Sequence, residues 1–342
     1  MSENLSYRDT GVDLDAAARA KDKLKELVES TRDQHTLSGV GHFGGLYELP
    51  EQLKSPVLVS SADGVGTKLK VAFQSGDHGT VGQCLVNHCV NDILVQGATP
   101  LFFLDYLATG ALRESIVEEV VRGVATACKE NTCALLGGET AEMPGFYPSG
   151  EYDLAGFIVG VVQREQLIDG SAICEGDVLL GIESSGLHTN GYTLARHIVF
   201  DVMKLSVVDE LPGLGRNVGD ELLAVHRSYL PPLKNLLERG LIRGLAHITG
   251  GGIPGNLPRV LPEGLGASVS RSSWDVPPLF QMLQEAGKVD RDEMDRVFNM
   301  GIGMIAVVAP EVVETVSCEV EKHGIGSWVI GEVEAGEGVA YV

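Results

Sequence analysis

Residues 63–68 carry the groups needed to hold a metal-bound polyphosphate. They read Asp63-Gly64-Val65-Gly66-Thr67-Lys68 and follow the apolar run 57–59. A carboxylate can ligate Mg²⁺, glycines let backbone N–H groups approach phosphate oxygens, and a lysine adds a compact positive charge. The spacing does not match a Walker A loop, and Asp-Gly-x-Gly is also typical of an ordinary hairpin turn. This segment alone therefore leaves a phosphate loop and a structural turn open.

A second group of polar side chains lies in the apolar segment 81–96, whose spacing predicts a helix. Asn87 and Asn91 are four residues apart and share one helical face, and Asp92 is adjacent. Amides and a carboxylate in an otherwise apolar helix need buried partners. A metal–phosphate cluster would supply these partners, and so would hydrogen bonds to a neighbouring loop.

Two further carboxylates follow predicted strands. Asp105 comes after the run 101–104, and Glu139 comes after the flexible pair Gly137-Gly138. Ligands of α/β sheets collect beyond the carboxyl ends of the strands, so we expect Asp63, Asp105 and Glu139 to share one rim. Several carboxylates that lie close together repel one another unless cations offset their charge. This favours Mg²⁺ that bridges nucleotide phosphates.

Two loops in the second half of the chain are typical of anion sites. Residues 184–192 leave a predicted strand and enter a helix, with hydroxyls, His188 and glycines at the junction. Such a helix N-terminus suits a substrate phosphate, and N-capping by Thr189 or Asn190 is compatible with that role. Residues 247–252 (HITGGG) form a second strand-to-helix loop, whose consecutive glycines indicate a close approach to the backbone.

One glycine pattern is deceptive. Residues 39–44 (GVGHFG) match the dinucleotide pattern G-x-G-x-x-G, but residues 33–38 predict no strand and Pro50 follows before a helix could form. We therefore reject a Rossmann site. The segment fits a glycine-rich flap over a nucleotide, with Phe43 as an apolar contact, or a plain surface loop.

The elements that must position these groups alternate between strands and helices, which predicts an α/β (α+β) protein. The predicted strands are 57–61, 101–106, 134–136, 154–162, 178–182, 267–269, 303–308 and 328–333. The predicted helices are 15–31, 81–96, 115–129, 192–203, 221–225, 231–238, 277–286 and 310–323. A polar connector at 164–176 divides the chain into two units, as its 342 residues suggest.

Composition and charge exclude several classes of protein. The chain is 44% hydrophobic and 21% charged, as in ordinary globular proteins, and its net charge of −21 argues against sequence-independent nucleic-acid binding. No apolar stretch approaches the roughly 18 residues of a membrane span, and no secretory signal is evident, so we expect a cytoplasmic protein without a membrane partner. The six cysteines fit no common zinc spacing. Cys84, Cys89 and Cys128 lie on apolar helical stripes, which predicts reduced, mostly buried thiols.

In their order along the chain, these motifs resemble the phosphoribosylformylglycinamidine cyclo-ligase (aminoimidazole ribonucleotide synthetase) family. The resemblance rests on residues 7–13 (YRDTGVD), 63–68, 91–92, 102–106 (FFLDY), 137–145 (GGETAEMPG), 184–192 and 247–252. It implies a homodimer with an ATP site in a cleft near the dimer interface. Residues 1–55 would form an N-terminal helix and loop, 56–168 an ATP- and Mg²⁺-binding domain that gives strands to a shared dimeric barrel, and 169–342 a C-terminal α/β domain that contributes to the substrate site.

The resemblance also suggests roles for residues that match the family's motifs. The expected ATP-binding residues are Lys25, Gly41, Phe43, Gly44, Asp63, Gly64, Gly66, Thr67, Lys68, Asn87, Asn91 and Gly138. The expected metal ligands are Asp63, Asp92 and Glu139, with Asp105 a weaker candidate. The expected substrate-binding residues are Ser185, His188, Asn190, Thr249, Gly250 and Gly251. Lys68 and His247 are expected to be catalytic. For His247 the reason is that a neutral imidazole binds Mg²⁺ poorly but carries protons well.

The implied reaction uses ATP and Mg²⁺ to close the imidazole ring of a purine precursor. ATP would phosphorylate the formyl amide oxygen of formylglycinamidine ribonucleotide, and the amidine nitrogen would then attack the activated carbon. Two alternatives stay open. One is the related formylglycinamidine synthetase, although no glutaminase half is recognisable, and the other is a catalytically inactive nucleotide-binding subunit.

Overall fold

The computed structural model describes residues 14–39 and 44–342 of the chain. The first of its two sheets has four strands in the order β1–β4–β2–β3. β1 and β2 both run antiparallel to β4, and β3 runs parallel to β2. The strands are β1 (Pro56–Gly64), β2 (Thr99–Thr109), β3 (Ala134–Glu142) and β4 (Tyr152–Gln163).

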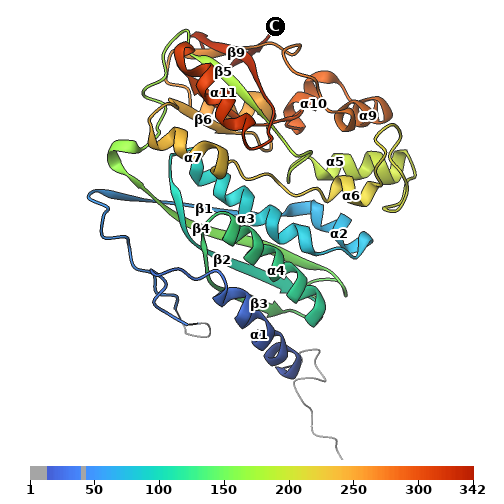
Figure 1. The fold of residues 1–342 in the computed structure, drawn as a ribbon. Coiled ribbons are helices and arrows are strands. Elements are labelled where there is room, and N and C mark those ends of the chain that lie inside the picture. Colours follow the sequence, from blue (N-terminus) through green and yellow to red (C-terminus); the bar gives the residue numbers. More distant parts are fainter. Residues whose placement is uncertain (1–13, 40–43) are drawn as a thin grey trace, which may run out of the picture.

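Helices gather on one face of this sheet (Figure 1). They are α1 (Leu14–Glu29), α3 (Gly79–Leu94) and α4 (Glu114–Glu130), while the short η2 (Gly66–Lys68) and α2 (Leu69–Ser75) follow β1. Two glycines allow α3 and α4 to pack closely. A Cβ on Gly82 would lie 2.2 Å from the Val120 carbonyl oxygen, and one on Gly123 would lie 2.3 Å from that of Gly79.

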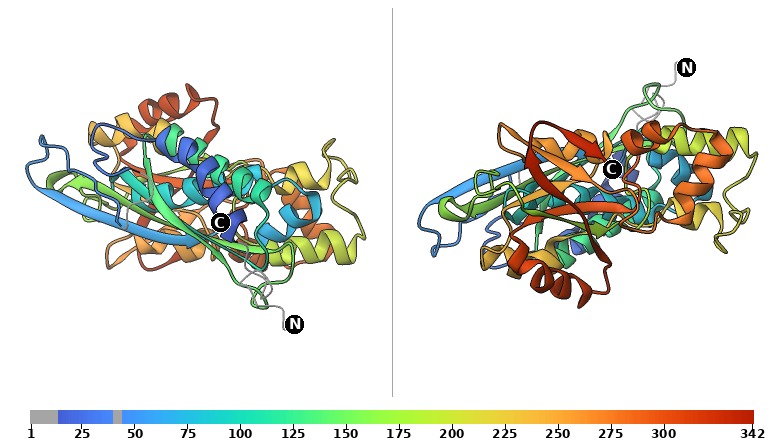
Figure 2. Two further views of the ribbon diagram at one scale, coloured as in Figure 1. Left: turned by 90° about the horizontal axis from the view of Figure 1, so that it is seen from below. Right: turned by 90° about the horizontal axis from the view of Figure 1, so that it is seen from above.

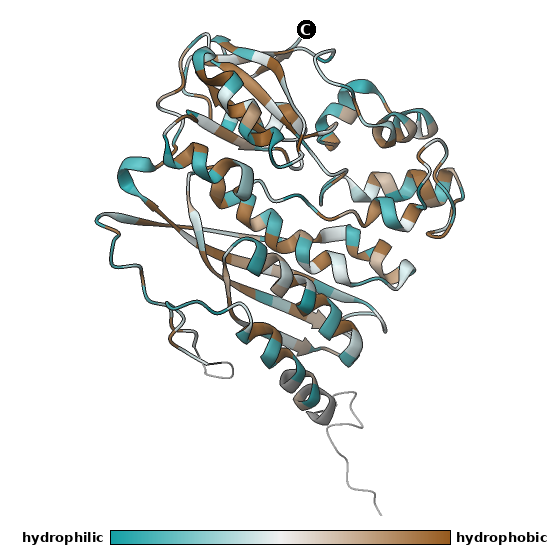
Figure 3. Cartoon of the chain, in the orientation of Figure 1, coloured by the Kyte–Doolittle hydropathy of each residue, from teal (hydrophilic) through white to brown (hydrophobic). Residues whose placement is uncertain are grey.

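The second sheet has six strands in the order β10–β7–β9–β5–β8–β6, and only the β10–β7 pair is parallel. Its strands are β5 (Val178–Glu183), β6 (Gly244–His247), β7 (Leu265–Val269), β8 (Ile302–Val308), β9 (Ser327–Ala335) and β10 (Val339–Tyr341). The associated α-helices are α5 (Tyr192–Arg196), α6 (Val218–Leu222), α7 (Leu230–Glu238), α8 (Gly252–Asn256), α9 (Pro278–Gly287), α10 (Arg291–Val297) and α11 (Val313–Glu321). All seven residues of β8 are buried, and Figure 3 shows hydrophobic residues concentrated along the strands of this sheet.

Helix α3 lies between the first sheet and the C-terminal half of the chain, as Figures 1 and 2 show. Asn87 Nδ2 donates a 2.7 Å hydrogen bond to the His226 carbonyl oxygen. Asn91 Nδ2 donates to the Arg227 carbonyl oxygen at 2.8 Å, and Asn91 Oδ1 accepts from the Tyr229 N–H at 2.9 Å. The two amides of α3 therefore fix the segment that precedes α7. Of the two partners considered for these amides, a metal–phosphate cluster or a neighbouring loop, the structure shows the loop.

The structure confirms the α/β fold class and most of the predicted elements. It corrects two helices: the one expected at 221–225 is Val218–Leu222, and the one expected at 192–203 is α5 followed by the π-helical turn η4 (His197–Val202). The predicted ranges did not include α2, α10 or β10, and they gave no bounds for β6 and α8, which the strand-to-helix interpretation of residues 247–252 implied. Cys84, Cys89, Cys128 and Cys133 are buried, while Cys174 and Cys318 are exposed. No helix of the described residues combines the length and apolar character needed to span a membrane.

Candidate active site

Two carboxylates meet at one imidazole on the helix-facing side of the first sheet. His88 and Asp92 lie one turn apart on α3, and Asp63 lies next to the last residue of β1. His88 Nε2 is 2.8 Å from Asp63 Oδ2 and 3.8 Å from Asp92 Oδ2. Ser61, which precedes Asp63 on the same face of β1, donates a 2.9 Å hydrogen bond to Asp92 Oδ2. The structure therefore brings together two of the predicted metal ligands, Asp63 and Asp92.

The charges of this group are mutually dependent. Burial would raise the pKa of Asp63, but the hydrogen bond and charge of His88 hold it below its ordinary value. Burial would likewise lower the pKa of His88, but the hydrogen bond to Asp63 and the charge of Asp92 raise it. The charge of Asp92 also raises the pKa of Asp63, so the two carboxylates repel each other and favour a cation between them.

His247, the last residue of β6, forms a hydrogen-bonded pair with Asp92. Its Nδ1 lies 2.8 Å from Asp92 Oδ1, and only 6% of the residue is exposed. Burial lowers the pKa of His247, although the hydrogen bond to Asp92 opposes this shift. A neutral imidazole with Nδ1–H bonded to a carboxylate carries its lone pair on the second nitrogen, which here faces His226 Nε2 at 3.1 Å.

The sequence analysis missed two members of this cluster, His88 and His226. A signal existed for His88, because it precedes Asp92 by four residues, as Asn87 precedes Asn91. No spacing signal marked His226, which lies in an irregular segment and is completely buried. His226 Nε2 lies 3.1 Å from His247 Nε2.

The expected rim of strand-end carboxylates is found only in part, because Asp63 and Asp105 both lie opposite Gly156 on one face of the sheet while Glu139 does not. Asp105 and Glu139 lie inside β2 and β3, which continue to Thr109 and Glu142. Asp105 is opposite Gly138, whereas Glu139 is opposite Tyr106. Side chains alternate along a strand, so Asp105 and Glu139 face opposite sides of the sheet. Burial raises the pKa of Asp105 to about 7. Metal binding by either residue stays a prediction that its position does not support.

Lys68 is not directed at an open phosphate site. It is completely buried, and its Nζ donates to the carbonyl oxygens of His188 at 2.9 Å and Ala224 at 2.6 Å. Burial would lower the pKa of Lys68, but neighbouring Cys84 and Tyr192 raise it. A phosphate contact stays a prediction, and it would require these two hydrogen bonds to break.

The remaining ATP-site candidates have mixed positions. Gly41 and Phe43 lie outside the described residues. Gly44 is exposed, and so is Lys25 on α1, for which no contact with the Asp63–Asp92 pair is found in the described part of the chain. Gly66 adopts a φ of +66° with open space at its Cβ position, which leaves its backbone approachable. Gly64 is the last residue of β1, and Thr67 lies in the turn η2 that follows. Gly138 lies on β3.

The two predicted substrate loops lie side by side. A Cβ on Gly250 would be 3.5 Å from Asn190 Nδ2, and Asn190 Oδ1 is buried without a hydrogen-bond partner in the described structure. His188 has a φ of +60°, and its Nε2 accepts a 3.1 Å hydrogen bond from the Ser185 N–H. Thr249 Oγ1 bonds to Asn256 Oδ1 at 3.2 Å, and Gly251 has a φ of +101°. As predicted, both loops lead from a strand into a helix.

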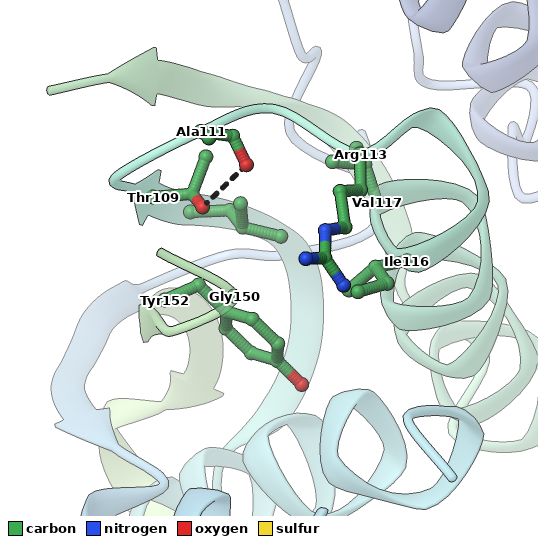
Figure 4. A pocket seen from close by; sticks show the side chains of 8 residues that line it. Thr109, Ala111, Arg113, Ile116, Val117, Gly150 and Tyr152 are labelled. Atoms are coloured by element: carbon green, nitrogen blue, oxygen red, sulfur yellow. Dashed lines mark hydrogen bonds between the residues drawn. The ribbon is translucent and has the colours of Figure 1, made fainter. Parts of the chain in front are cut away.

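A groove of about 490 Å³ runs beside the first of these loops. It is lined by Thr67, Thr189, Asn190, Gly191, Tyr192, Thr193, Leu194, His197, Glu293 and Val297. A second cavity, near Thr109, Arg113 and Tyr152 (Figure 4), is far smaller at about 10 Å³, roughly one water molecule. It includes no residue of the two predicted substrate loops. The groove is therefore the better candidate for a ligand.

Comparison with known proteins places this chain in a family. The N-terminal domain model of AIR synthase related proteins matches residues 44–162, and the C-terminal domain model matches residues 175–342. A relative from Trichlorobacter lovleyi, named phosphoribosylformylglycinamidine cyclo-ligase, is 52% identical over 96% of this chain and 95% of its own. A protein of the same name from Methylobacillus flagellatus is 51% identical over 97% of this chain and 95% of its own.

Solved structures with the same fold are more distant in sequence. A thiamine-monophosphate kinase from Stenotrophomonas maltophilia has a TM-score of 0.70 at 18% identity, covering 93% of this chain and 95% of its own. A hydrogenase maturation protein in complex with ATP has a TM-score of 0.68 at 19% identity, covering 96% of this chain and 89% of its own. These confirm the two-domain fold expected from the sequence. From the family models and the half-identical relatives, the chain belongs to the phosphoribosylformylglycinamidine cyclo-ligase family.

Proposed function

We propose that this chain is an ATP-dependent cyclo-ligase that converts formylglycinamidine ribonucleotide into aminoimidazole ribonucleotide, ADP and phosphate in purine biosynthesis. The observation that carries the proposal is the Asp92–His247 pair beside Asp63, in a chain half identical to relatives named for this activity. The pair offers a base and a carboxylate site for a metal within one cluster.

The carboxylates fit a Mg²⁺ ion. Asp63 and Asp92 converge on His88 Nε2, repel each other, and keep 40% and 25% of their side chains exposed. Mg²⁺ prefers carboxylate oxygens and usually keeps several waters, so two partly exposed carboxylates suit it. When bound there, Mg²⁺ would neutralise charge on the ATP phosphates. Glu139 would have to reach this ion from the other face of the sheet.

ATP is the only co-reactant that the proposed reaction needs. The formyl amide oxygen attacks the γ-phosphorus of ATP, and ADP leaves. The amidine nitrogen then attacks the formyl carbon, phosphate departs with the former amide oxygen, and loss of a proton completes the ring. We assign acceptance of this proton to His247, whose Nδ1–H bond to Asp92 stabilises the imidazolium that forms.

The backbone and the two glycine loops would position the substrates. Gly66, which has open space at its Cβ position, provides an approachable backbone beside Asp63, whereas the Gly64 N–H donates a 2.6 Å hydrogen bond to Asp63 Oδ1. Asn190 Oδ1, buried without a partner in the described structure, is an acceptor available to the ribonucleotide, and Gly250 lies beside it. The distant ATP-bound hydrogenase maturation protein supports nucleotide binding by this fold.

A homodimer is part of the proposal. The face of the first sheet opposite α3 and α4 exposes Leu58 (58%) and Phe157 (48%), which are apolar side chains of β1 and β4. Strands with one exposed apolar face need a partner layer, and a second copy would provide it by closing the two sheets into a barrel. We place the enzyme in the cytoplasm, as expected for purine biosynthesis.

The experiment is a coupled assay of ADP release with formylglycinamidine ribonucleotide, ATP and Mg²⁺, combined with colorimetric detection of the imidazole. Release of ADP that depends on the substrate and matches the imidazole formed supports the cyclo-ligase. ATP turnover only with ammonia and the formylglycinamide substrate would favour the synthetase. No turnover in either mixture would favour an inactive nucleotide-binding subunit.

A further inference from the structure

The groove of about 490 Å³ lies between the first substrate loop and helix α10. Residues 189–194 and His197 form one wall, Glu293 and Val297 of α10 form another, and Thr67 contributes from the N-terminal half. Figure 1 shows α5 and α10 on the same side of the molecule. The volume falls within the range of about 300–1,000 Å³ that is usual for small-molecule sites. The groove is therefore large enough for part of a substrate.

Glycines of both substrate loops allow α10 to approach them. A Cβ on Gly191 would lie 2.4 Å from the ring of Phe298, the residue that follows α10. A Cβ on Gly252 would lie 1.8 Å from the carbonyl oxygen of Asp295. Both glycines have positive φ angles, of +77° and +61°. At these two positions the close approach to the backbone is made by the chain itself, and it fixes α10 as a wall of the groove.

The polar groups that the groove leaves unused are hydrogen-bond acceptors. Glu293 is exposed, and no ion pair or hydrogen bond of its side chain is found among residues 14–39 and 44–342. Asn190 Oδ1 is buried and likewise has no partner in the described structure. By contrast, the hydroxyls of Thr67 and Thr193 bond to each other at 3.0 Å. The groove therefore suits a ligand that donates hydrogen bonds.

The charge of the lining opposes a phosphate group. Glu293 brings a carboxylate, and the lining found in the described part of the chain includes no lysine or arginine. His197 also lines the groove, but its Nδ1 lies 3.0 Å from the Asp201 carboxylate. A carboxylate repels a phosphate dianion. The groove therefore does not suit the phosphates of ATP or of the ribonucleotide.

The proposed reaction decides which donors of formylglycinamidine ribonucleotide are left for the groove. The amidine nitrogen attacks the carbon that ATP activates, so the amidine must lie near the Asp63–Asp92 pair. The ribose is bonded to this amidine. Thr189 lies in the groove wall, and its Oγ1 is 2.6 Å from Nδ1 of His88, whose Nε2 meets Asp63. A substrate whose amidine lies at this cluster can therefore extend its ribose into the groove.

We propose that the groove binds the ribose of the ribonucleotide, with the Glu293 carboxylate accepting hydrogen bonds from the 2′- and 3′-hydroxyls. The two oxygens of a carboxylate can accept from both hydroxyls of a vicinal diol. Dinucleotide-binding folds likewise place an acidic residue on the ribose 2′-hydroxyl. The inference rests on the proposed function, because it names the part of that substrate that lies in the groove. It makes Glu293 a residue that selects a ribosyl over a 2′-deoxyribosyl substrate.

The test is calorimetric titration of the full chain with the ribonucleotide and with its 2′-deoxyribosyl analogue, in Mg²⁺ and a non-hydrolysable ATP analogue. Wild type should bind the ribonucleotide about tenfold or more tightly than the analogue, because a hydrogen bond to a charged group is lost. Glu293→Gln keeps the shape of the side chain without its charge, so this preference should shrink several-fold. Glu314→Gln, at an exposed carboxylate of α11, should keep the preference of wild type.

In turnover, Glu293→Gln should raise the KM for the ribonucleotide and change kcat much less, because Glu293 does not contact the reacting atoms. Thermal unfolding confirms that each variant is folded. An unchanged preference in Glu293→Gln would overturn the inference, while binding of the ribonucleotide by wild type would leave the proposed substrate in place. No binding of the ribonucleotide by wild type would contradict the proposed function as well.

ATP carries the other ribose that could occupy the groove. Titration with ATP and with 2′-deoxy-ATP, in the absence of the ribonucleotide, separates the two sources. We expect Glu293→Gln to leave the preference for ATP over 2′-deoxy-ATP as it is in wild type. A reduced preference for ATP, with that for the ribonucleotide unchanged, would assign the groove to the nucleotide and overturn the inference.

Discussion

Lys68 donates a 2.9 Å hydrogen bond from its ammonium group to the carbonyl oxygen of His188, across the boundary between the two halves of the molecule. Its second bond, to Ala224, holds the segment that leads into His226. No ion pair of residues 14–39 and 44–342 includes Lys68, although its ammonium is fully buried. A buried charge without a carboxylate is costly, so Lys68 is best understood as the residue that fixes two histidine-bearing loops.

Replacement of Lys68 by Met should therefore lower stability. Two buried carbonyl oxygens would lose their donor, at about 1–3 kcal/mol each, and relief of the ammonium burial would offset part of this loss. We expect a net decrease in the free energy of unfolding of roughly 1–3 kcal/mol in urea titrations, with a lower kcat. Lys322→Met, at a side chain that is 67% exposed, is the control. A raised KM for ATP at unchanged stability would instead indicate a phosphate contact.

His247→Asn tests the proposed base. Asparagine can keep a hydrogen-bond donor towards Asp92 but cannot accept a proton, so kcat should fall by about 100-fold or more. The KM for ATP should change much less, because the Asp63–Asp92 pair is retained. His323→Asn is the matched control, and thermal unfolding checks the fold. Wild-type turnover by His247→Asn would remove this residue from the mechanism.

Asp105 should make stability depend on pH. Burial raises its pKa from an ordinary 3.8 to about 7, so the folded state holds a proton that the unfolded state has lost between these values. Stability contributed by this group is therefore complete below about pH 4, declines as pH rises, and is gone above about pH 7.

Asp105→Asn removes the titration, so the variant should gain stability relative to wild type as the pH rises from about 5 to about 8, by roughly 1–3 kcal/mol. Urea unfolding at both pH values measures the difference. Asp275→Asn, at an exposed carboxylate, should follow wild type. A parallel pH response in wild type and Asp105→Asn would show that Asp105 is ionised in the folded protein.

The exposed face of the first sheet predicts the assembly. Leu58→Glu should convert a dimer of the 36.4 kDa chain to a monomer, because it places a charge in the expected apolar interface. Val208→Glu, at a residue that is 79% exposed in the C-terminal half, should leave the mass unchanged. Light scattering after size-exclusion chromatography measures both. A monomeric wild type at micromolar concentration would contradict the prediction.

Strong local periodicity made much of the fold predictable. Leu85, Cys89 and Ile93 repeat at four-residue intervals, and all three are fully buried on α3. Helix α8 has five residues and strand β10 has three, so neither is long enough to show a period. Strand ends were less predictable, because β2 and β3 continue through the polar residues Asp105 and Glu139, which had suggested their ends.

The candidate site was predictable only where its residues carry a local pattern. Asp63 is marked by the glycines around it, and His247 by the three glycines that follow. The partner that each carboxylate finds was not predictable, since His247 is 155 residues away from Asp92 along the chain. His226 contributes through tertiary contacts alone. The buried role of Lys68 was hidden for the same reason, because its acceptors are backbone oxygens of the other half.

The most direct test of the central claim follows the oxygen atom of the formyl amide. Formylglycinamidine ribonucleotide labelled with ¹⁸O at this position is converted with ATP and Mg²⁺, and the phosphate is analysed by mass spectrometry. Phosphorylation of the amide oxygen predicts one ¹⁸O atom in each phosphate released, in step with imidazole formation. Unlabelled phosphate formed together with the imidazole would show that ATP does not activate this oxygen, and would contradict the account.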